Sequence, residues 1–296
     1  MTKMVHCLSF DIEEHFQVSA FASPMRRRHW DQFESRVERN TEKVLELLAM
    51  HNARATFFVL GWVAERHQRM VRQIVQAGHE VASHGYAHEL VSVQTEWQFR
   101  EDVRRARVLL EDITGSRVLG YRAPSFTIGK DTLWALRILV EEGYVYDSSI
   151  FPICHDRYGM LAASPFTHQL STEAGPIWEI PPSTIKIAGV RVPVAGGGYL
   201  RLFPEWLFRR WLNELEAQNH TLVLYLHPWE LDPAQPRMKG PLLSRFRHYV
   251  NLHKTEHRLI HLLEEFHFAP ICEAIEPIKT IIKGLHFVSM SHATGS

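Results

Sequence analysis

The chain has 296 residues and a mass of 34.4 kDa, and its 33 Lys and Arg residues balance its 33 Asp and Glu residues. Because the net charge is zero, no overall field draws the protein to nucleic acid or to an anionic membrane, and a neutral polymer or small molecule is the better expected ligand. The cysteines Cys7, Cys154 and Cys272 are odd in number and widely spaced, which excludes a disulfide framework and a zinc–cysteine site. The first residues lack the apolar run of a signal peptide or a membrane-spanning helix, so we expect a cytoplasmic protein.

Strand and helix patterns alternate through the first half of the chain. In chain order they are a strand at 5–10, a helix capped by Asn40 or Thr41, a strand at 55–60, a helix at 63–77, a strand at 80–83, a helix at about 95–114, a strand at 117–121, a helix at 131–142 and a strand at 144–146. Such alternation is typical of an α/β fold with a parallel sheet.

The pattern changes at residue 148. Residues 148–204 are rich in Pro, Gly and Ser around β-type runs at 178–180 and 184–194, which indicates a β-rich insertion or lid. The later elements are a helix at 205–218, a strand at 221–226, a polar stretch to about 254, a helix at 255–266 and a strand at 267–271. We therefore expect one catalytic domain over 1–272, a distorted (β/α) barrel of seven strands, followed by a peripheral tail at 273–296.

Polar residues gather where several expected strands end, which is the catalytic face of an α/β barrel. Asp11, Glu13 and Glu14 follow the first strand, and His84 and His88 are spaced so that one turn can present both imidazoles to a metal. Two histidines and one carboxylate form a recurrent open site for Zn²⁺ and related ions.

Three more candidates follow later strands. Arg122 is placed to clamp a carboxylate, although a structural salt bridge is the alternative reading. Asp147 is a candidate site residue that fits equally well as a turn former or helix cap. His227 comes directly after a strongly apolar strand, where an imidazole suits a general acid.

The ordered segments FDIEEHF, ATFFVLG, GHEVASHGYAH, GYRAP, YDSS and LYLHP resemble the motifs of the polysaccharide deacetylases, carbohydrate esterase family 4. The resemblance runs from Asp11 to His227. Residues 179–204, EIPPSTIKIAGVRVPVAGGGYLRLFP, are similar to the extra region of the subgroup linked to exosortase-associated exopolysaccharide operons.

The resemblance implies one role for each matching residue. Those roles are catalytic base for Asp11, metal ligands for His84 and His88, an arginine that holds the base for Arg122, an oxyanion donor for the backbone amide of Ser125, general acid for His227, and tuning of that acid for Asp147. Ile12 stands where the family usually has a second aspartate, so Glu13 is nominated as third ligand and Glu14 remains the alternative.

The implied activity is metal-dependent hydrolysis of N-acetyl groups on an amino-sugar polysaccharide or oligosaccharide, in exopolysaccharide biosynthesis. Zn²⁺ is the expected ion, with Co, Mn, Ni and Fe as alternatives. Rival readings are a small-molecule amidohydrolase of the same fold and an inactive carbohydrate-binding scaffold. The glycine-rich segment 196–201 is either a sugar-binding surface that uses Tyr199 or an ordinary turn.

Overall fold

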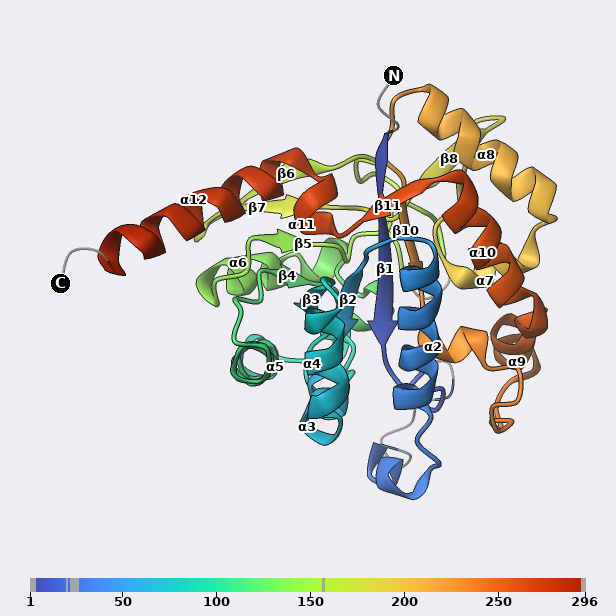
Figure 1. Ribbon diagram of the computed structural model, residues 1–296, viewed down its shortest axis with the longest axis horizontal. Helices are drawn as coiled ribbons and strands as arrows, with labels where there is room; N and C mark the ends of the chain where they lie inside the picture. The colour runs from blue at the N-terminus through green and yellow to red at the C-terminus, as the bar shows by residue number, and fades with distance from the viewer. Residues whose placement is uncertain (1–3, 20, 22–26, 156–157, 294–296) are drawn as a thin grey trace.

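The computed structural model describes residues 4–19, 21, 27–155 and 158–293, with side chains described as far as residue 284. It confirms an α/β fold with a mostly parallel central sheet (Figure 1). The parallel strands are, in sheet order, β10 (Val223–Leu226), β1 (Val5–Ile12), β2 (Thr56–Val59), β3 (Glu80–Ser83), β4 (Gly120–Tyr121), β5 (Tyr146–Asp147) and β7 (Gly175–Glu179). Each pairs in parallel with its neighbour, so their carboxyl ends meet at one edge of the sheet.

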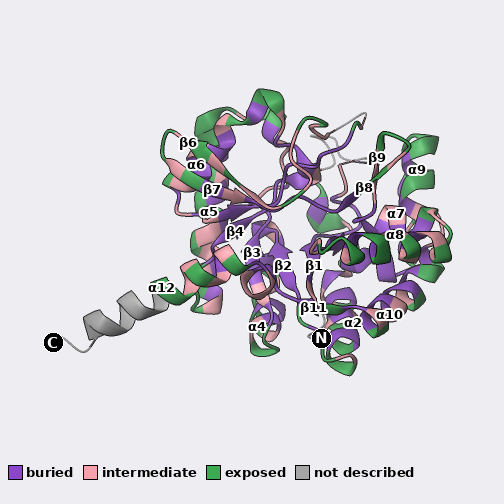
Figure 2. Cartoon of the chain, turned by 90° about the horizontal axis from the view of Figure 1, so that it is seen from above, coloured by how far each residue is buried: buried purple, intermediate pink, exposed green. Residues whose placement is uncertain are grey.

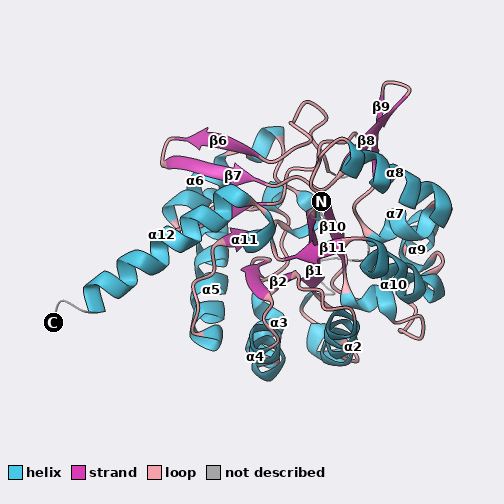
Figure 3. Ribbon diagram, turned by 45° about the horizontal axis from the view of Figure 1, so that its top comes forward, coloured by secondary structure: helices cyan, strands magenta, loops and turns pink. Residues whose placement is uncertain are grey.

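The segment expected to be an insertion contributes to this sheet. Strand β7, which contains most of the run at 178–180, pairs with β5, and β6 (His168–Thr172), which the sequence pattern did not predict, adds to β7 in antiparallel fashion. The run at 184–194 is a separate hairpin of β8 (Thr184–Ile187) and β9 (Val190–Pro193), which Figure 3 shows standing away from the sheet. Only part of 148–204 is therefore peripheral to the central sheet.

The described strands form an open path from β10 to β6. Main-chain and side-chain hydrogen bonds cross from the chain after β7 to β10: Ser183 N donates to Val223 O at 3.1 Å, and Val223 N donates to Ser183 Oγ at 2.8 Å. The predicted last strand is present as β11 (His267–Ala269), and it pairs with the first residues of β1. The chain after β7 therefore lies beside β10, and β11 lies beside β1.

Helices surround the sheet. They are α2 (Val37–Met50), α3 (Gly61–Arg66), α4 (Gln68–Gln76), α5 (Glu96–Thr114), α6 (Trp134–Glu141), α7 (Gly197–Leu202), α8 (Glu205–Ala217), α9 (Leu242–Tyr249), α10 (Thr255–Glu265), α11 (Ile271–Ala274) and α12 (Glu276–Ala293). The part of the chain expected as a tail is mostly α12, which extends away from the body in Figures 1 and 2. Within the described residues, no helix is both long and apolar enough to span a bilayer.

Local signals explain which helix boundaries were predictable. Helix α5 begins at a capping box between Thr95 and Gln98 and ends at Gly115, whose φ of 65° is the left-handed conformation that glycine favours. The helix predicted at 63–77 is instead two helices, α3 and α4, separated at His67. No proline or glycine stands at that break, so no helix-breaking residue predicts it.

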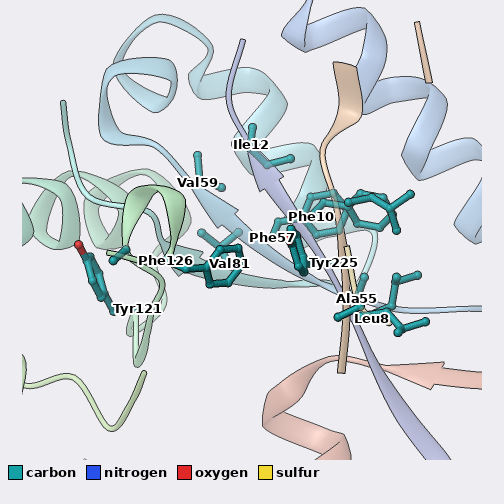
Figure 4. Close-up of a cluster of buried hydrophobic side chains, with 14 of the residues drawn as sticks. Leu8, Phe10, Ile12, Ala55, Phe57, Val59, Val81, Tyr121, Phe126 and Tyr225 are labelled. Carbon is teal, nitrogen blue, oxygen red and sulfur yellow. The ribbon is translucent and has the colours of Figure 1, made fainter. Parts of the chain in front are cut away.

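The two faces of β1 pack differently, because alternate side chains of a strand point to opposite sides. Leu8, Phe10 and Ile12 pack in the main apolar cluster, together with residues of β2 such as Phe57 (Figure 4). The other face begins with the apolar Cys7, which packs in the cluster that contains Ile271 and Ile275. That face becomes polar toward the carboxyl end of β1, so its polar side chains lie next to the apolar cluster that contains Cys7.

Candidate active site and metal centre

Glu13, His84 and His88 form a buried group whose candidate ligand atoms all lie within 4.8 Å of one another. Glu13 follows β1, and both histidines follow β3, two strands along the sheet. Glu13 Oε2 lies 2.5 Å from His88 Nε2 and 3.9 Å from His84 Nε2. The structure therefore brings together the three residues that the sequence nominated.

The protonation of this group suits a divalent ion. The Nδ1 atom of His84 lies 2.8 Å from the carbonyl oxygen of Arg122, and because a carbonyl only accepts, Nδ1 carries the proton and Nε2 keeps its lone pair. Burial lowers the pKa of His84 to about 4, which keeps that imidazole neutral. Burial alone would raise the pKa of Glu13, but the charges of His88 and His227 lower it to about 2. A neutral imidazole and an ionised carboxylate are the forms that bind metal, so the donor set fits one.

The neighbouring acid Glu14 has a different contact. Its carboxylate accepts hydrogen bonds from the backbone amides of Arg36 at 3.1 Å and Val37 at 3.2 Å, and from Ser35 Oγ at 2.5 Å. It therefore caps the amino end of α2, where an anion stabilises the unpaired amides and the helix dipole. The prediction that Asn40 or Thr41 caps this helix is wrong, because the cap comes from Glu14, which is distant in the sequence.

Asp11 is held by Arg122, as the sequence suggested. Arg122 is fully buried, and its Nη1 donates to Asp11 Oδ1 at 2.7 Å and to Ser9 Oγ at 2.9 Å. Its remaining nitrogens donate to the carbonyl and hydroxyl oxygens of Ser148. The other carboxylate oxygen of Asp11 lies 3.9 Å from His227 Nε2, so the base and the acid candidates approach the same point.

Two residues that the sequence analysis missed hold His227. Its Nδ1 atom lies 2.8 Å from Glu230 Oε1, and the other oxygen of Glu230 forms an ion pair with the buried Arg201. Gly197 leaves the room for this carboxylate, since a Cβ atom there would collide with both of its oxygens. The available signals were the spacing of Glu230 three residues after His227 and the segment GGGYLR, in which Arg201 is the last residue.

Trp229 is a third missed residue. Its Nε1 donates to Glu13 Oε1 at 3.2 Å, and its ring stacks on His227 with a centroid distance of 5.0 Å. On its other side it stacks on His248 at 4.2 Å. Trp229 thus links the metal candidate Glu13 to the general-acid candidate His227.

Asp147 lies elsewhere than its predicted role requires. Its carboxyl group accepts from Ser149 Oγ at 2.5 Å and contacts Glu179, which is its register partner on β7. The structure records no contact between Asp147 and His227, and Glu230 holds the place expected for Asp147. Burial raises the pKa of Asp147 to about 6 and raises that of Glu179 well above the usual range.

A cavity of about 430 Å³ opens over the candidate residues. Its lining includes Asp11, Glu13, His84, His88, Ser125, Tyr158, Gly197, Arg201, Tyr225, His227 and Trp229. Ser125 has a φ of 54°, a left-handed conformation that is uncommon for serine. The aromatic side chains of Phe126, Tyr158, Tyr225 and Trp229 line the cavity, whereas Tyr199, the expected sugar contact, is not part of the lining.

Two family models match parts of this chain. Residues 27–141 match the family model for polysaccharide deacetylase, and residues 148–276 match a domain of unknown function (DUF3473). A peptidoglycan deacetylase of Helicobacter pylori is 32% identical over 108 residues, which are 36% of this chain and 36% of the relative. A peptidoglycan-N-acetylglucosamine deacetylase of Bacillus cereus is 35% identical over 86 residues, 29% of each chain.

The chain thus spans about a third of the length of these curated relatives. A crystal structure from Mycobacterium smegmatis, of a protein assigned as a polysaccharide deacetylase, covers 95% of this chain and 92% of its own, with a TM-score of 0.63 at 21% identity. That likeness shows a shared fold. The family model and the curated relatives thus show that the amino-terminal part of this chain is similar to polysaccharide deacetylases.

Proposed function

We propose that the protein is a metal-dependent hydrolase that removes N-acetyl groups from an amino-sugar polysaccharide or oligosaccharide. The observation that carries this proposal is the approach of Asp11 and His227 to one buried group of Glu13, His84 and His88. Each of the two is held by its own charged partner, Arg122 for Asp11 and Glu230 for His227. An acid and a base on either side of a metal-ligand set are what amide hydrolysis requires.

The metal would be held by Glu13, His84 and His88, with Zn²⁺ the ion that best suits two imidazoles and one carboxylate. A divalent ion supplies Lewis acidity, which lowers the pKa of water and polarises the acetyl carbonyl. Because Glu14 is engaged at the start of α2, Glu13 is the third ligand in this proposal.

The chain's own residues perform the proton transfers. Arg122 holds one oxygen of Asp11 in an ion pair, so the free oxygen of Asp11 is aimed to accept a proton from the attacking water. The backbone amide of Ser125, at the cavity wall, stabilises the negative charge that develops on the acetyl oxygen. His227 presents Nε2 to the same point and gives a proton to the departing sugar amine. Acetate and a free amino sugar are the products.

We further propose a cytoplasmic role in exopolysaccharide biosynthesis. Support for this finer assignment comes from residues 179–204, which are similar to the extra region of the subgroup linked to exopolysaccharide operons and which include the cavity residues Gly197 and Arg201. Deletion of the gene in its host, followed by measurement of the acetyl content of the cell's glycans, tests that role.

The activity itself is tested by acetate release. Apo-protein is supplied with Zn²⁺, Co²⁺, Mn²⁺, Ni²⁺ or Fe²⁺ in turn and incubated with N-acetylated oligosaccharides of defined linkage and with small amides. Metal-dependent release from oligosaccharides supports the proposal. Release from small amides alone would identify an amidohydrolase, and release from no substrate would identify a binding scaffold.

A further inference from the structure

The outer face of α9 carries exposed apolar side chains close to the cavity. Leu242, Leu243 and Phe246 retain 81%, 56% and 55% of their surface in contact with solvent. On the opposite face of the same helix, Ser244 and His248 are buried and line the cavity. Helix α9 thus has one side on the cavity and another side, coloured as exposed in Figure 2, that carries three large apolar groups.

Cations border this apolar face. At about 100° per residue, Leu242, Phe246 and Leu243 fall within one arc of the helix, with Arg245 at one edge and Arg247 at the other. Both arginines are exposed. An exposed apolar arc with basic residues at its edges is the pattern of helices that lie in the interface of a membrane.

The surrounding segment is basic although the whole chain is neutral. Residues 233–255 contain Arg237, Lys239, Arg245, Arg247 and Lys254 and no acidic residue. The last acid before them, Asp232, is paired with Arg36 and Arg39. The zero net charge therefore conceals a local positive cluster, and our expectation that an anionic membrane has no attraction for this protein does not hold for this face.

The chemistry of this face selects among possible occupants. A neutral glycan has no negative charge to pair with the arginines, and of the three apolar side chains only Phe246 offers it a stacking ring. A second copy joined about a two-fold axis at α9 would set one basic segment against another. An anionic lipid surface supplies both the apolar depth and the negative charge.

We propose that α9 and the basic segment around it dock the protein on an anionic lipid surface. Leu242, Leu243 and Phe246 would enter the headgroup region, and the cavity behind Ser244 and His248 would then lie at the bilayer surface. The substrate class that this arrangement suits is a glycan attached to lipid or held close to the membrane. That substrate assignment rests on the proposed function, whereas lipid binding does not.

The test is flotation of the full chain with vesicles of phosphatidylcholine and phosphatidylglycerol, against vesicles of phosphatidylcholine alone. Binding is expected only to the anionic vesicles, and an ionic strength of about 0.5 M should weaken it. The triple variant Leu242→Ser, Leu243→Ser, Phe246→Ser should lower the partition coefficient by about tenfold or more. Arg245→Glu should lower it as well, whereas the matched control Trp97→Ser, which removes an exposed apolar group from α5, should not.

Three results would overturn the docking proposal. They are absence of binding to anionic vesicles, equal binding by wild type and triple variant, and a wild-type dimer that the triple variant converts to monomer. Acetate release from a soluble oligosaccharide, measured without vesicles, should be the same for wild type and triple variant. Absence of acetate release from both proteins would count against the proposed function. It would not change what the flotation experiment shows about docking.

Discussion

His227 Nδ1 lies 2.8 Å from a carboxylate oxygen of Glu230, and the other oxygen of Glu230 is paired with the buried Arg201. Because an ionised carboxylate only accepts, Nδ1 carries one proton, and Nε2, the nitrogen that gives its proton to the leaving amine in the proposed mechanism, faces Asp11 and Glu13. The orientation of the proposed acid therefore depends on a charged pair from the second half of the chain.

Glu230→Gln should reduce deacetylation of an N-acetylated oligosaccharide by about 10- to 100-fold, because the amide keeps the size of the side chain but not its charge. An activated acetate ester needs little protonation of its leaving group, so its hydrolysis should fall less. The measurement is kcat for both substrates, with Glu264→Gln, an exposed acid on α10, as control. His227→Ala should show the same contrast, and equal slowing of both substrates would exclude His227 as the acid.

Asp11→Asn should retain the metal and lose turnover by about 10²-fold or more, since the amide cannot accept the proton from water. The substitution also leaves the buried Arg122 without its counter-charge, so the free energy of unfolding should fall by about 3 kcal/mol. Elemental analysis, urea denaturation and acetate release measured on one preparation check the three effects. Turnover near the wild-type level would show that another group is the base.

The two adjacent acids should respond differently to the same change. Glu13→Gln should lose the bound metal, because its carboxylate faces the histidines. Glu14→Gln should keep the metal and lower the free energy of unfolding by about 1 kcal/mol, because it caps α2. Elemental analysis and denaturation distinguish them. Loss of metal in the Glu14 variant alone would transfer the ligand role to Glu14.

The pair Asp147 and Glu179 should make stability depend on pH. Burial raises the pKa of both carboxyl groups, that of Asp147 to about 6, so the folded protein keeps protons that the unfolded chain releases above about pH 4. This contribution to stability is complete below pH 4 and is lost as the pH rises through 6.

Glu179→Gln removes one of these titrations and keeps a hydrogen-bond donor for Asp147. The free energy of unfolding of the variant, relative to wild type, should therefore rise by about 1–3 kcal/mol between pH 4 and pH 8. Urea denaturation at a series of pH values measures this difference. A difference that stays constant with pH would show that the two carboxyl groups do not share a proton.

The sequence predicted what depends on local pattern. The strand at 80–83 and the helix that ends before Gly115 were predictable because apolar periodicity and terminal residues mark them directly. The gathering of Asp11, His84 and Arg122 followed from the rule that parallel strands place their carboxyl ends together.

Features that depend on distant contacts were not predictable. Glu14 caps a helix that begins 23 residues later in the chain, and Glu230 is oriented by Arg201, which lies in an earlier helix. Helix α9 was missed because its large apolar side chains lie on the exposed face, so the apolar pattern does not mark the side that packs on the protein. In each case tertiary packing, which leaves no periodic signal, decides the structure.

The position of β1 has a consequence during synthesis. It precedes the other described strands in the chain, yet its partners β10 and β11 lie beyond residue 222. A nascent chain must therefore carry an apolar strand without these partners until both later segments have been made, and pairs of such large sequence separation form slowly. The sheet around Asp11 is thus completed only after β10 has been made, and chaperone protection of β1 would matter most in that interval.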